Sequence, residues 1–349
     1  MKFVNLIAQV PWAFTTPSAA FLQRYAQVPR TCTTPSLALL QQFALSCSDI
    51  SVVHTVPGTQ HLENLALRHN GDVLVTSTSS AFVHLVSPGE RFVTRVGQIP
   101  GVTSLTGIAE LQRDVFFVSG LNLTGFDAKG TNVVWKLDMR QFYADGNGAI
   151  LEPARTELVT EMPSAGLLNG MTRLSSHDGS HLLLSDSSRG SIIRLNIDTK
   201  AYEVVIQDPT MGSAPGGPSV GVNGIHTHND RLFYTNSNRE LFAQVPISLV
   251  TGRAKGEAEV LINTGLVAAD DFALSKDGKR AWIAKNGEHL VLEVDIMART
   301  TSVAINSTIL GASSAVALGK DEFGRQVLYA TGALETHNPP VGALFKIYL

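Results

Sequence analysis

Residues Gly221-Val-Asn-Gly-Ile-His-Thr-His-Asn-Asp-Arg-Leu-Phe-Tyr-Thr-Asn236 read as two short strands around a polar turn. The first strand opens at Asn223, and the second strand, Leu232-Phe-Tyr-Thr235, is apolar and ends in a hydroxyl residue. Two runs rich in apolar, aromatic and β-branched residues on either side of a short polar segment indicate a β-hairpin.

The same pattern occurs six times along the chain. Each copy has a small or polar residue, a second small residue, an apolar strand, a turn, and a second strand that ends in Thr, Ser or Ala. The copies open at Glu63, Thr106, Asn169, Asn223, Asp270 and Ser314, so successive openings lie 43 to 63 residues apart. Four-stranded propeller blades occupy roughly 40–50 residues, and such blades bury their faces only by packing around a common axis. The sequence therefore predicts an all-β fold, a six-bladed β-propeller.

The propeller is predicted to span residues 50–349, after an N-terminal helical extension at residues 1–49. Two similar segments, Thr15–Gln23 and Thr33–Gln41, each place Pro after a Thr cap and then apolar residues at helical spacing. The β-rich run Ile50–Val56 is expected to pair with the last strand, Leu344–Leu349, and to complete the sixth blade. This N- and C-terminal strand closure would remove the open edges of the first and last blades.

The composition favours a small-molecule protein. The 27 basic and 30 acidic residues give a net charge of −3, without a dense Lys/Arg cluster, which argues against nucleic-acid binding. Only 16% of residues are charged, so we expect an apolar or aromatic substrate. No apolar run approaches 18 residues, so no transmembrane segment is predicted. The start of the chain resembles a signal peptide that Asn5 interrupts, which leaves a cytoplasmic or secretory location open.

The opening residues are expected to converge, because the first strand of each blade lies nearest the axis of a propeller. Glu63, Asn169, Asn223 and Asp270 would bring two carboxylates and two amides together. Such hard oxygen ligands suit Ca²⁺, so we predict an axial Ca²⁺ site and no organic cofactor. The alternative is a polar channel in which these side chains and water satisfy one another. Asp271 would replace Asp270 if the register shifted by one residue.

The loops that enter the inner strands share a face with the loops between the second and third strands, because antiparallel strands alternate in direction. On this face we predict His61, Arg189 and Lys285 as catalytic residues. The expected substrate-binding residues are Met162, Met211, Asn236, Arg239 and His337. Each of these side chains also fits a structural role, as a solvated loop charge or a packing residue.

With these motifs, residues 50–349 resemble the regucalcin/gluconolactonase family of six-bladed propellers. The likeness is carried by Glu63, Asn169-Gly170, Asn223-Gly224 and Asp270, which match that family's calcium ligands in order. The resemblance implies a calcium-dependent lactonase, in which the ion polarises a lactone carbonyl. Glu63-Asn64-Leu65 departs from the family, which has Glu-Gly-Pro there, and the N-terminal region is a second departure.

Several blades are more similar to a fungal natural-product branch of this superfamily that includes hetero-Diels–Alderases. The residues are His61-Leu-Glu-Asn-Leu-Ala66, Leu168-Asn-Gly-Met171, Val222-Asn-Gly-Ile225 and Asp270-Asp-Phe-Ala-Leu274. This resemblance implies a cyclase that joins a tropolone-type quinone methide to a terpene alkene in an apolar pocket on one face of the propeller. We call this face, on which the loops enter the inner strands at the six opening residues, the ring-opening face. We take the cyclase as the first hypothesis, the lactonase as the alternative, and a non-enzymatic interaction platform as the third.

Overall fold

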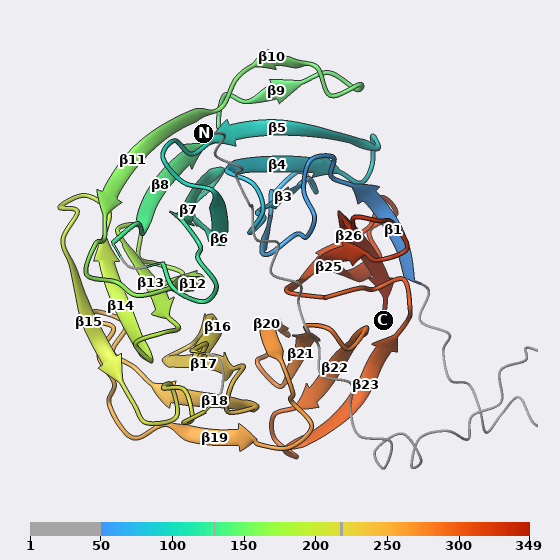
Figure 1. The fold of residues 1–349 in the computed structure, drawn as a ribbon. Helices are drawn as coiled ribbons and strands as arrows, with labels where there is room; N and C mark the ends of the chain where they lie inside the picture. Colours follow the sequence, from blue (N-terminus) through green and yellow to red (C-terminus); the bar gives the residue numbers. More distant parts are fainter. Residues whose placement is uncertain (1–49, 129, 217–218) are drawn as a thin grey trace, which may run out of the picture. The chain divides into compact units, whose positions relative to one another are not determined.

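The computed structural model describes residues 50–349 except residues 129 and 217–218. In this part of the chain every regular element is a β-strand, and six four-stranded sheets surround a central axis (Figure 1). The predicted six-bladed propeller is therefore confirmed. The predicted helical extension, with Cys32 and Cys47, lies outside the described residues. No helix of the described part is long and apolar enough to cross a membrane.

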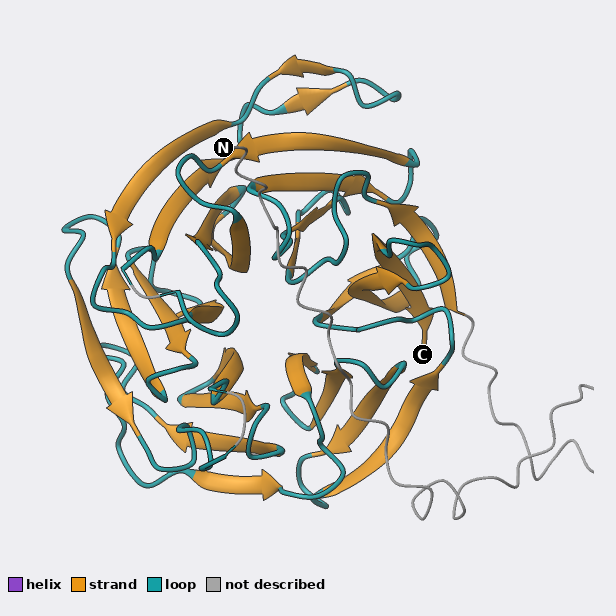
Figure 2. Cartoon of the chain, in the orientation of Figure 1, coloured by secondary structure: helices purple, strands orange, loops and turns teal. Residues whose placement is uncertain are grey.

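Each blade is an antiparallel sheet whose first strand lies nearest the axis (Figure 2). Blade I contains β2 (Leu65–Leu67), β3 (Val73–Val75), β4 (Phe82–Ser87) and β5 (Phe92–Gln98). Blade II contains β6 (Ser104–Gln112), β7 (Val115–Leu121), β8 (Val133–Asp138) and β11 (Arg155–Glu161). Blade III contains β12 (Leu168–Arg173), β13 (His181–Asp186), β14 (Ser191–Asn196) and β15 (Tyr202–Gln207).

The remaining blades follow the same plan. Blade IV contains β16 (Val222–His228), β17 (Arg231–Asn236), β18 (Leu241–Pro246) and β19 (Glu259–Ile262). Blade V contains β20 (Ala269–Leu274), β21 (Arg280–Lys285), β22 (Leu290–Asp295) and β23 (Thr300–Asn306). Blade VI contains β24 (Val316–Lys320), β25 (Gln326–Leu334), β26 (Val341–Tyr348) and β1 (Ile50–Thr55). Blade II also carries a small hairpin, β9 (Tyr143–Ala144) and β10 (Ile150–Glu152), outside β5 in Figure 1.

Blade VI is completed by the strand that comes first in the described chain. β1 pairs antiparallel with β26, from Ile50 opposite Ile347 to Thr55 opposite Ala343. This pairing confirms the predicted strand closure. It removes two free edges that could otherwise pair with other chains.

Hydroxyl groups at the ends of second strands join neighbouring blades. Each of these groups donates to the backbone carbonyl of the residue that opens the next blade. The pairs are Thr76 Oγ1 to Thr106 O (2.6 Å), Ser185 Oγ to Asn223 O (2.6 Å), Thr235 Oγ1 to Asp270 O (2.6 Å) and Thr331 Oγ1 to Glu63 O (2.8 Å). Because both partners are buried, loss of one hydroxyl would leave a carbonyl unsatisfied. These bonds explain why the repeat places Thr or Ser at this position.

The second small residue of the repeat allows inner strands to approach one another. A Cβ on Gly107 would lie 2.3 Å from Asn169 O, and one on Gly170 would lie 2.5 Å from Asn223 O. In both cases the clash is with the backbone of the next blade, which has no freedom to move aside. Glycine is therefore required at these two positions by the close packing around the axis.

The hydrophobic core lies between the faces of adjacent blades. One cluster, for example, joins Phe117 and Val134 of blade II to Leu184 and Leu195 of blade III. A polar exception is His84 in β4, which is 2% exposed and lies opposite Arg95 in β5. Neither ring nitrogen of His84 has a hydrogen-bond partner. The burial, together with the nearby positive charge of Arg95, lowers the pKa of His84 to about 4.

Candidate functional site

The six opening residues surround the axis, and none is more than 9% exposed. Asn286 Nδ2 connects two of them, because it donates to Asp270 Oδ2 at 3.0 Å and to Ser314 Oγ at 3.2 Å. Asn223 stands on the adjacent blade IV, where its Nδ2 donates to Ser237 Oγ at 2.9 Å. Three neighbouring blades therefore contribute side chains to one buried polar ring.

Burial governs the protonation of the two ring carboxyls. It raises the pKa of Glu63 well above its usual range, and the nearby charges of Asp270 and Asp271 raise it further. Burial also raises the pKa of Asp270 to about 7, although the hydrogen bond from Asn286 opposes the shift. None of the six opening residues is a Lys or Arg that could supply a compensating charge. A bound cation would supply that charge and reverse both shifts.

Asn169 is the ring residue with an unused acceptor. Its Oδ1 atom is buried without a hydrogen-bond partner. A buried amide oxygen of this kind is costly unless a cation, a donor or a water molecule reaches it. Among the described residues, no group of three or more His, Cys, Asp and Glu side chains is arranged to hold a metal ion. A cation at this ring would therefore depend on the amide oxygens of Asn169 and Asn223 as well as on the two carboxylates.

His61 lies beside the ring. Its Nε2 atom is 2.7 Å from Ala312 O and 2.9 Å from Ser314 Oγ, and its Nδ1 atom is 3.7 Å from Glu63 Oε2. Because a carbonyl oxygen only accepts, the hydrogen of the neutral ring sits on Nε2, and the lone pair of Nδ1 is directed at Glu63. Burial lowers the pKa of His61, which favours this neutral form.

The other two predicted catalytic residues are engaged within their own loops. The Arg189 side chain is exposed, and its Nε atom is 3.7 Å from the fully buried carboxylate of Asp186. Lys285 is 5% exposed, and its ammonium donates to Gly265 O at 2.9 Å and to Glu288. The structure therefore brings His61 to the ring, whereas Arg189 and Lys285 make the polar contacts described above with residues outside it.

The structure places the two methionines predicted to bind substrate inside the fold. Met162 and Met211 have no exposed surface and belong to interblade hydrophobic clusters. Their loops fold inward because buried amides hold the loop carbonyls. Asn132 Nδ2 donates to Ala165 O at 3.1 Å, and Asn236 Nδ2 donates to Thr210 O at 2.8 Å. These methionines therefore pack the blades and do not line an open pocket.

The three polar residues predicted to bind substrate have different surroundings. Asn236 is fully buried and also receives Arg239 N at 2.9 Å, so it holds its loop in place. Arg239 is exposed, and its Nε atom donates to Gly212 O at 2.7 Å. His337 is exposed on the loop between β25 and β26, with only a long 3.4 Å contact to Thr336. Of the three, His337 keeps most of its hydrogen-bonding capacity for solvent or a ligand.

An apolar cluster lies among the loops of the ring-opening face. It contains Leu121, Ala128 and Leu167, with Leu123 and Val220 packed against it. These residues come from the loop that follows β7 and from the loops that precede β12 and β16. The cluster gives this face an apolar component beside the polar ring.

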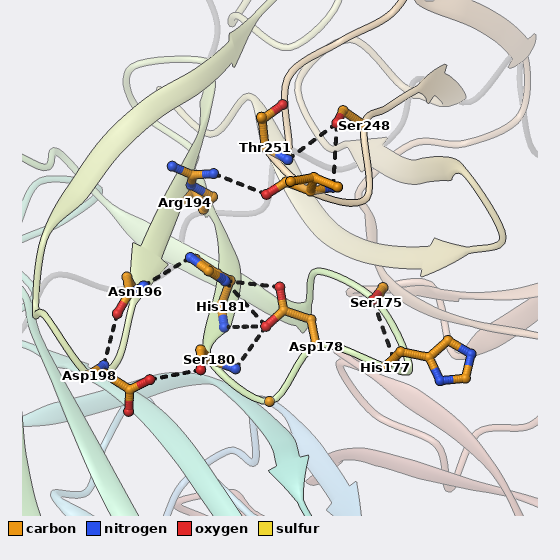
Figure 3. A network of polar contacts seen from close by, with 12 residues as sticks. Ser175, His177, Asp178, Ser180, His181, Arg194, Asn196, Asp198, Ser248 and Thr251 are labelled. Carbon is orange, nitrogen blue, oxygen red and sulfur yellow. Dashed lines mark hydrogen bonds and ion pairs between the residues drawn. The ribbon is translucent and has the colours of Figure 1, made fainter.

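Polar side chains also meet at the opposite end of the blades, but their hydrogen-bonding capacity is used. In Figure 3, His181 Nδ1 donates to Asp178 Oδ2 at 2.9 Å, and its Nε2 atom accepts from Asn196 at 3.0 Å. Asp178 also receives the backbone N–H groups of Ser180 and His181. With both ring nitrogens occupied, His181 fixes the turn between β12 and β13 and has no free base.

A cavity of about 600 Å³ also opens at this opposite end. It is bordered by the turns Arg68–Asp72 and Ser87–Glu90 of blade I, residues Phe142–Ala144 of blade II and Lys320–Glu322 of blade VI. Inside it, Arg68 Nη2 lies 2.8 Å from Asp114 Oδ2. None of the ring residues borders this cavity, so it is separate from the candidate site.

Sequence reasoning missed two parts of the site, Asn286 and the bonded group around Asp271. Asp271 accepts from Asn64 Nδ2 at 3.1 Å and from His226 Nε2 at 2.9 Å. The adjacent acids Asp270 and Asp271 were the available signal in the sequence. Successive side chains of a strand point to opposite faces, so the two carboxylates must lie in different surroundings. For Asn286 we find no signal in the sequence.

The fold is shared with several solved structures. Among solved structures, the chain is similar to a luciferin-regenerating enzyme, with a TM-score of 0.61 and 13% identity, covering 86% of this chain and 95% of that one. It is also similar to the calcium-binding protein regucalcin from Agrobacterium tumefaciens, with a TM-score of 0.60 and 16% identity, covering 86% and 93%. At these identities the likeness shows the fold, a regucalcin-like six-bladed propeller.

Sequence comparison is more specific. The chain is 28% identical over 317 residues to a Phoma protein that bears the provisional name hetero-Diels–Alderase, covering 82% of this chain and 87% of the relative. It is 26% identical over 216 residues to a Sarocladium schorii protein of the same provisional name, covering 53% and 50%. No family model matches the chain.

Proposed function

We propose that this chain is a natural-product cyclase of the hetero-Diels–Alderase type, acting at the ring-opening face. The observation that carries the proposal is the similarity to the Phoma relative, which spans 82% of this chain and 87% of that protein. The proposed substrates are a tropolone-type quinone methide, as the heterodiene, and a terpene alkene.

The reaction requires few chemical groups from the protein, because it is a cycloaddition in which π bonds of the two partners are converted into σ bonds. One C–C bond and one C–O bond form together, and no proton, electron or leaving group is exchanged. Holding the two partners in a reactive pose removes much of the entropic barrier, and a hydrogen-bond donor at the heterodiene carbonyl lowers it further. Apolar side chains and one or two polar donors are therefore sufficient.

The ring-opening face offers both components. Leu123 and Val220, which pack on buried Leu121 and Leu167, are partly exposed apolar side chains among its loops. Asn169 has a buried amide whose oxygen has no partner, and His61 lies beside the ring. We assign the side-chain amide N–H of Asn169 as the donor to a substrate carbonyl, since the unpartnered amide oxygen can only accept. His61 is assigned as a neighbour that shapes the entrance.

A direct assay tests this proposal. The protein is incubated with a quinone-methide precursor and a polyene such as humulene, with and without EDTA, and adducts are separated by chiral chromatography. We expect stereoselective adduct formation that survives EDTA and falls about 100-fold in Asn169→Leu, the usual effect of losing one such donor. Asn70→Leu, at the opposite end of blade I, is the matched control and should keep full activity. Racemic adduct at the uncatalysed rate would refute the proposal.

The ring geometry favours one alternative, a calcium-dependent lactonase. We propose Glu63, Asn169, Asn223 and Asp270 as ligands for Ca²⁺, because they form a buried oxygen set with one unpartnered acceptor. A bound Ca²⁺ would act as a Lewis acid on a lactone carbonyl. EDTA-sensitive opening of aromatic or aliphatic lactones would establish this alternative and overturn the cyclase assignment.

A further inference from the structure

The residues in second position of the six repeats form a layer directly below the ring. In blades II to IV this residue is Gly107, Gly170 or Gly224, and the neighbouring strand occupies the space. In blade VI it is Ala315, another small residue. Only blades I and V carry polar side chains here, Asn64 and Asp271.

These two polar side chains reach each other across blade VI. Asn64 Nδ2 donates to Asp271 Oδ2 at 3.1 Å, although 207 residues separate them. The small Ala315 side chain of the intervening blade leaves room for this contact. Asn64 follows Glu63, and Asp271 follows Asp270, so the bond joins the backbones that carry the two ring carboxyls.

Asp271 also contacts blade IV, its neighbour on the other side from blade VI. Its Oδ1 accepts from His226 Nε2 of blade IV at 2.9 Å and from its own neighbour, Phe272 N, at 2.7 Å. The His226 ring rests edge-on against Phe272, with 4.8 Å between centroids. The carboxylate lies over Gly224, where a Cβ would be 2.3 Å from Oδ1. Both oxygens of Asp271 are thus occupied by protein donors.

We infer that Asp271 is a positioning residue that fixes Glu63 of blade I relative to Asp270 of blade V, and thereby tunes the ring for a hard cation. The inference rests on the cation site proposed above. Asp271 acts through its hydrogen bonds to Asn64 and His226, which hold both of its oxygens toward protein donors. Partners of this kind commonly change metal affinity by about 10- to 100-fold.

Terbium luminescence, with Ca²⁺ as competitor, measures ion affinity on the full chain. We expect Asp271→Asn and Asn64→Ala each to weaken Tb³⁺ binding at least about 10-fold. Gly224→Ala keeps the side chains of all candidate ligands, but its Cβ would lie 2.3 Å from Asp271 Oδ1 and 2.6 Å from Asp271 Cα, so it should displace Asp271 and weaken binding as well. The matched control is Asp178→Asn, which breaks a comparable Asp–His pair at the opposite end of the blades and should leave affinity unchanged.

The outcomes separate the two claims. If folded Asp271→Asn and Gly224→Ala bind Tb³⁺ as the wild type does, the inference is wrong while the cation site stands. If the wild type binds neither Tb³⁺ nor Ca²⁺, the cation site itself is refuted and the inference with it. Should Asp271→Asn fail to fold, Asn64→Ala and Gly224→Ala decide the question, with far-UV circular dichroism as the check on folding.

Discussion

Acid should destabilise this propeller through His84, and the effect can be calculated from its surroundings. The side chain is 2% exposed, its nitrogens have no partners, and its pKa is lowered from 6.5 to about 4. The unfolded chain binds a proton at this residue below pH 6.5, whereas the folded chain does so only near pH 4. The stability associated with neutral His84 is therefore complete above pH 6.5 and is lost as the pH falls toward 4. A shift of this size corresponds to about 3 kcal/mol.

The comparison of wild type with His84→Leu isolates this contribution from those of other titrating groups. Leucine fills a similar volume and removes two unsatisfied buried nitrogens, so the variant should match or exceed wild-type stability at pH 7.5. Urea unfolding at pH 7.5, 6, 5 and 4.5 should show the gap between the two proteins widening toward acid, to about 3 kcal/mol at the lower limit. His337→Gln, a change in an exposed loop, should follow the wild type throughout. Parallel stability curves for His84→Leu and wild type would refute the reasoning.

Three further changes test other parts of the structure. Thr235→Val should lower the free energy of unfolding by about 1 to 3 kcal/mol in urea titrations, because the carbonyl of Asp270 loses its donor; an unchanged midpoint would contradict the role given to these hydroxyls. Gly107→Ala should destabilise the fold by at least about 1 to 3 kcal/mol, since its Cβ meets the backbone of Asn169. An unchanged free energy of unfolding would show that the inner strands can move apart enough to accept a methyl group. Arg68→Ala should cost about 3 to 5 kcal/mol, because the buried Asp114 carboxylate loses both guanidinium hydrogen bonds and keeps only His69 Nδ1 at 3.4 Å. Arg68→Ala combined with Asp114→Ala should recover part of that loss, and failure to recover would argue against the pair.

The repeat pattern predicted the fold because it records local requirements that recur in several blades. The hydroxyl at the end of the second strand and the glycine after the opening residue each reflect a contact with the next blade. Blades that are adjacent in sequence are adjacent in space, so these contacts can be inferred from one copy and extended to the others. Strand closure by Ile50–Thr55 followed from the same count of strands.

The candidate site was only partly predictable, for two physical reasons. The contact of Asn64 with Asp271 joins blades that are not neighbours, and it depends on the small side chain of Ala315 between them. Loop residues also resist prediction, because a single buried amide can turn a loop inward. Asn236 and Asn132 do this for the segments that contain Met211 and Met162, which the sequence pattern placed on an open surface.

The pairing of β1 with β26 has a consequence for biosynthesis. The partners lie almost 300 residues apart, so β1 leaves the ribosome long before the strand it needs. At roughly 5 to 20 residues per second, that interval is about 15 to 60 s. During this time blade I and its successors can stack in order of synthesis, while the ring stays open and β1 remains an unpaired edge. Production in vivo should therefore depend on chaperone capacity more than the stability of the closed ring would suggest, and slowing translation should lengthen the vulnerable period.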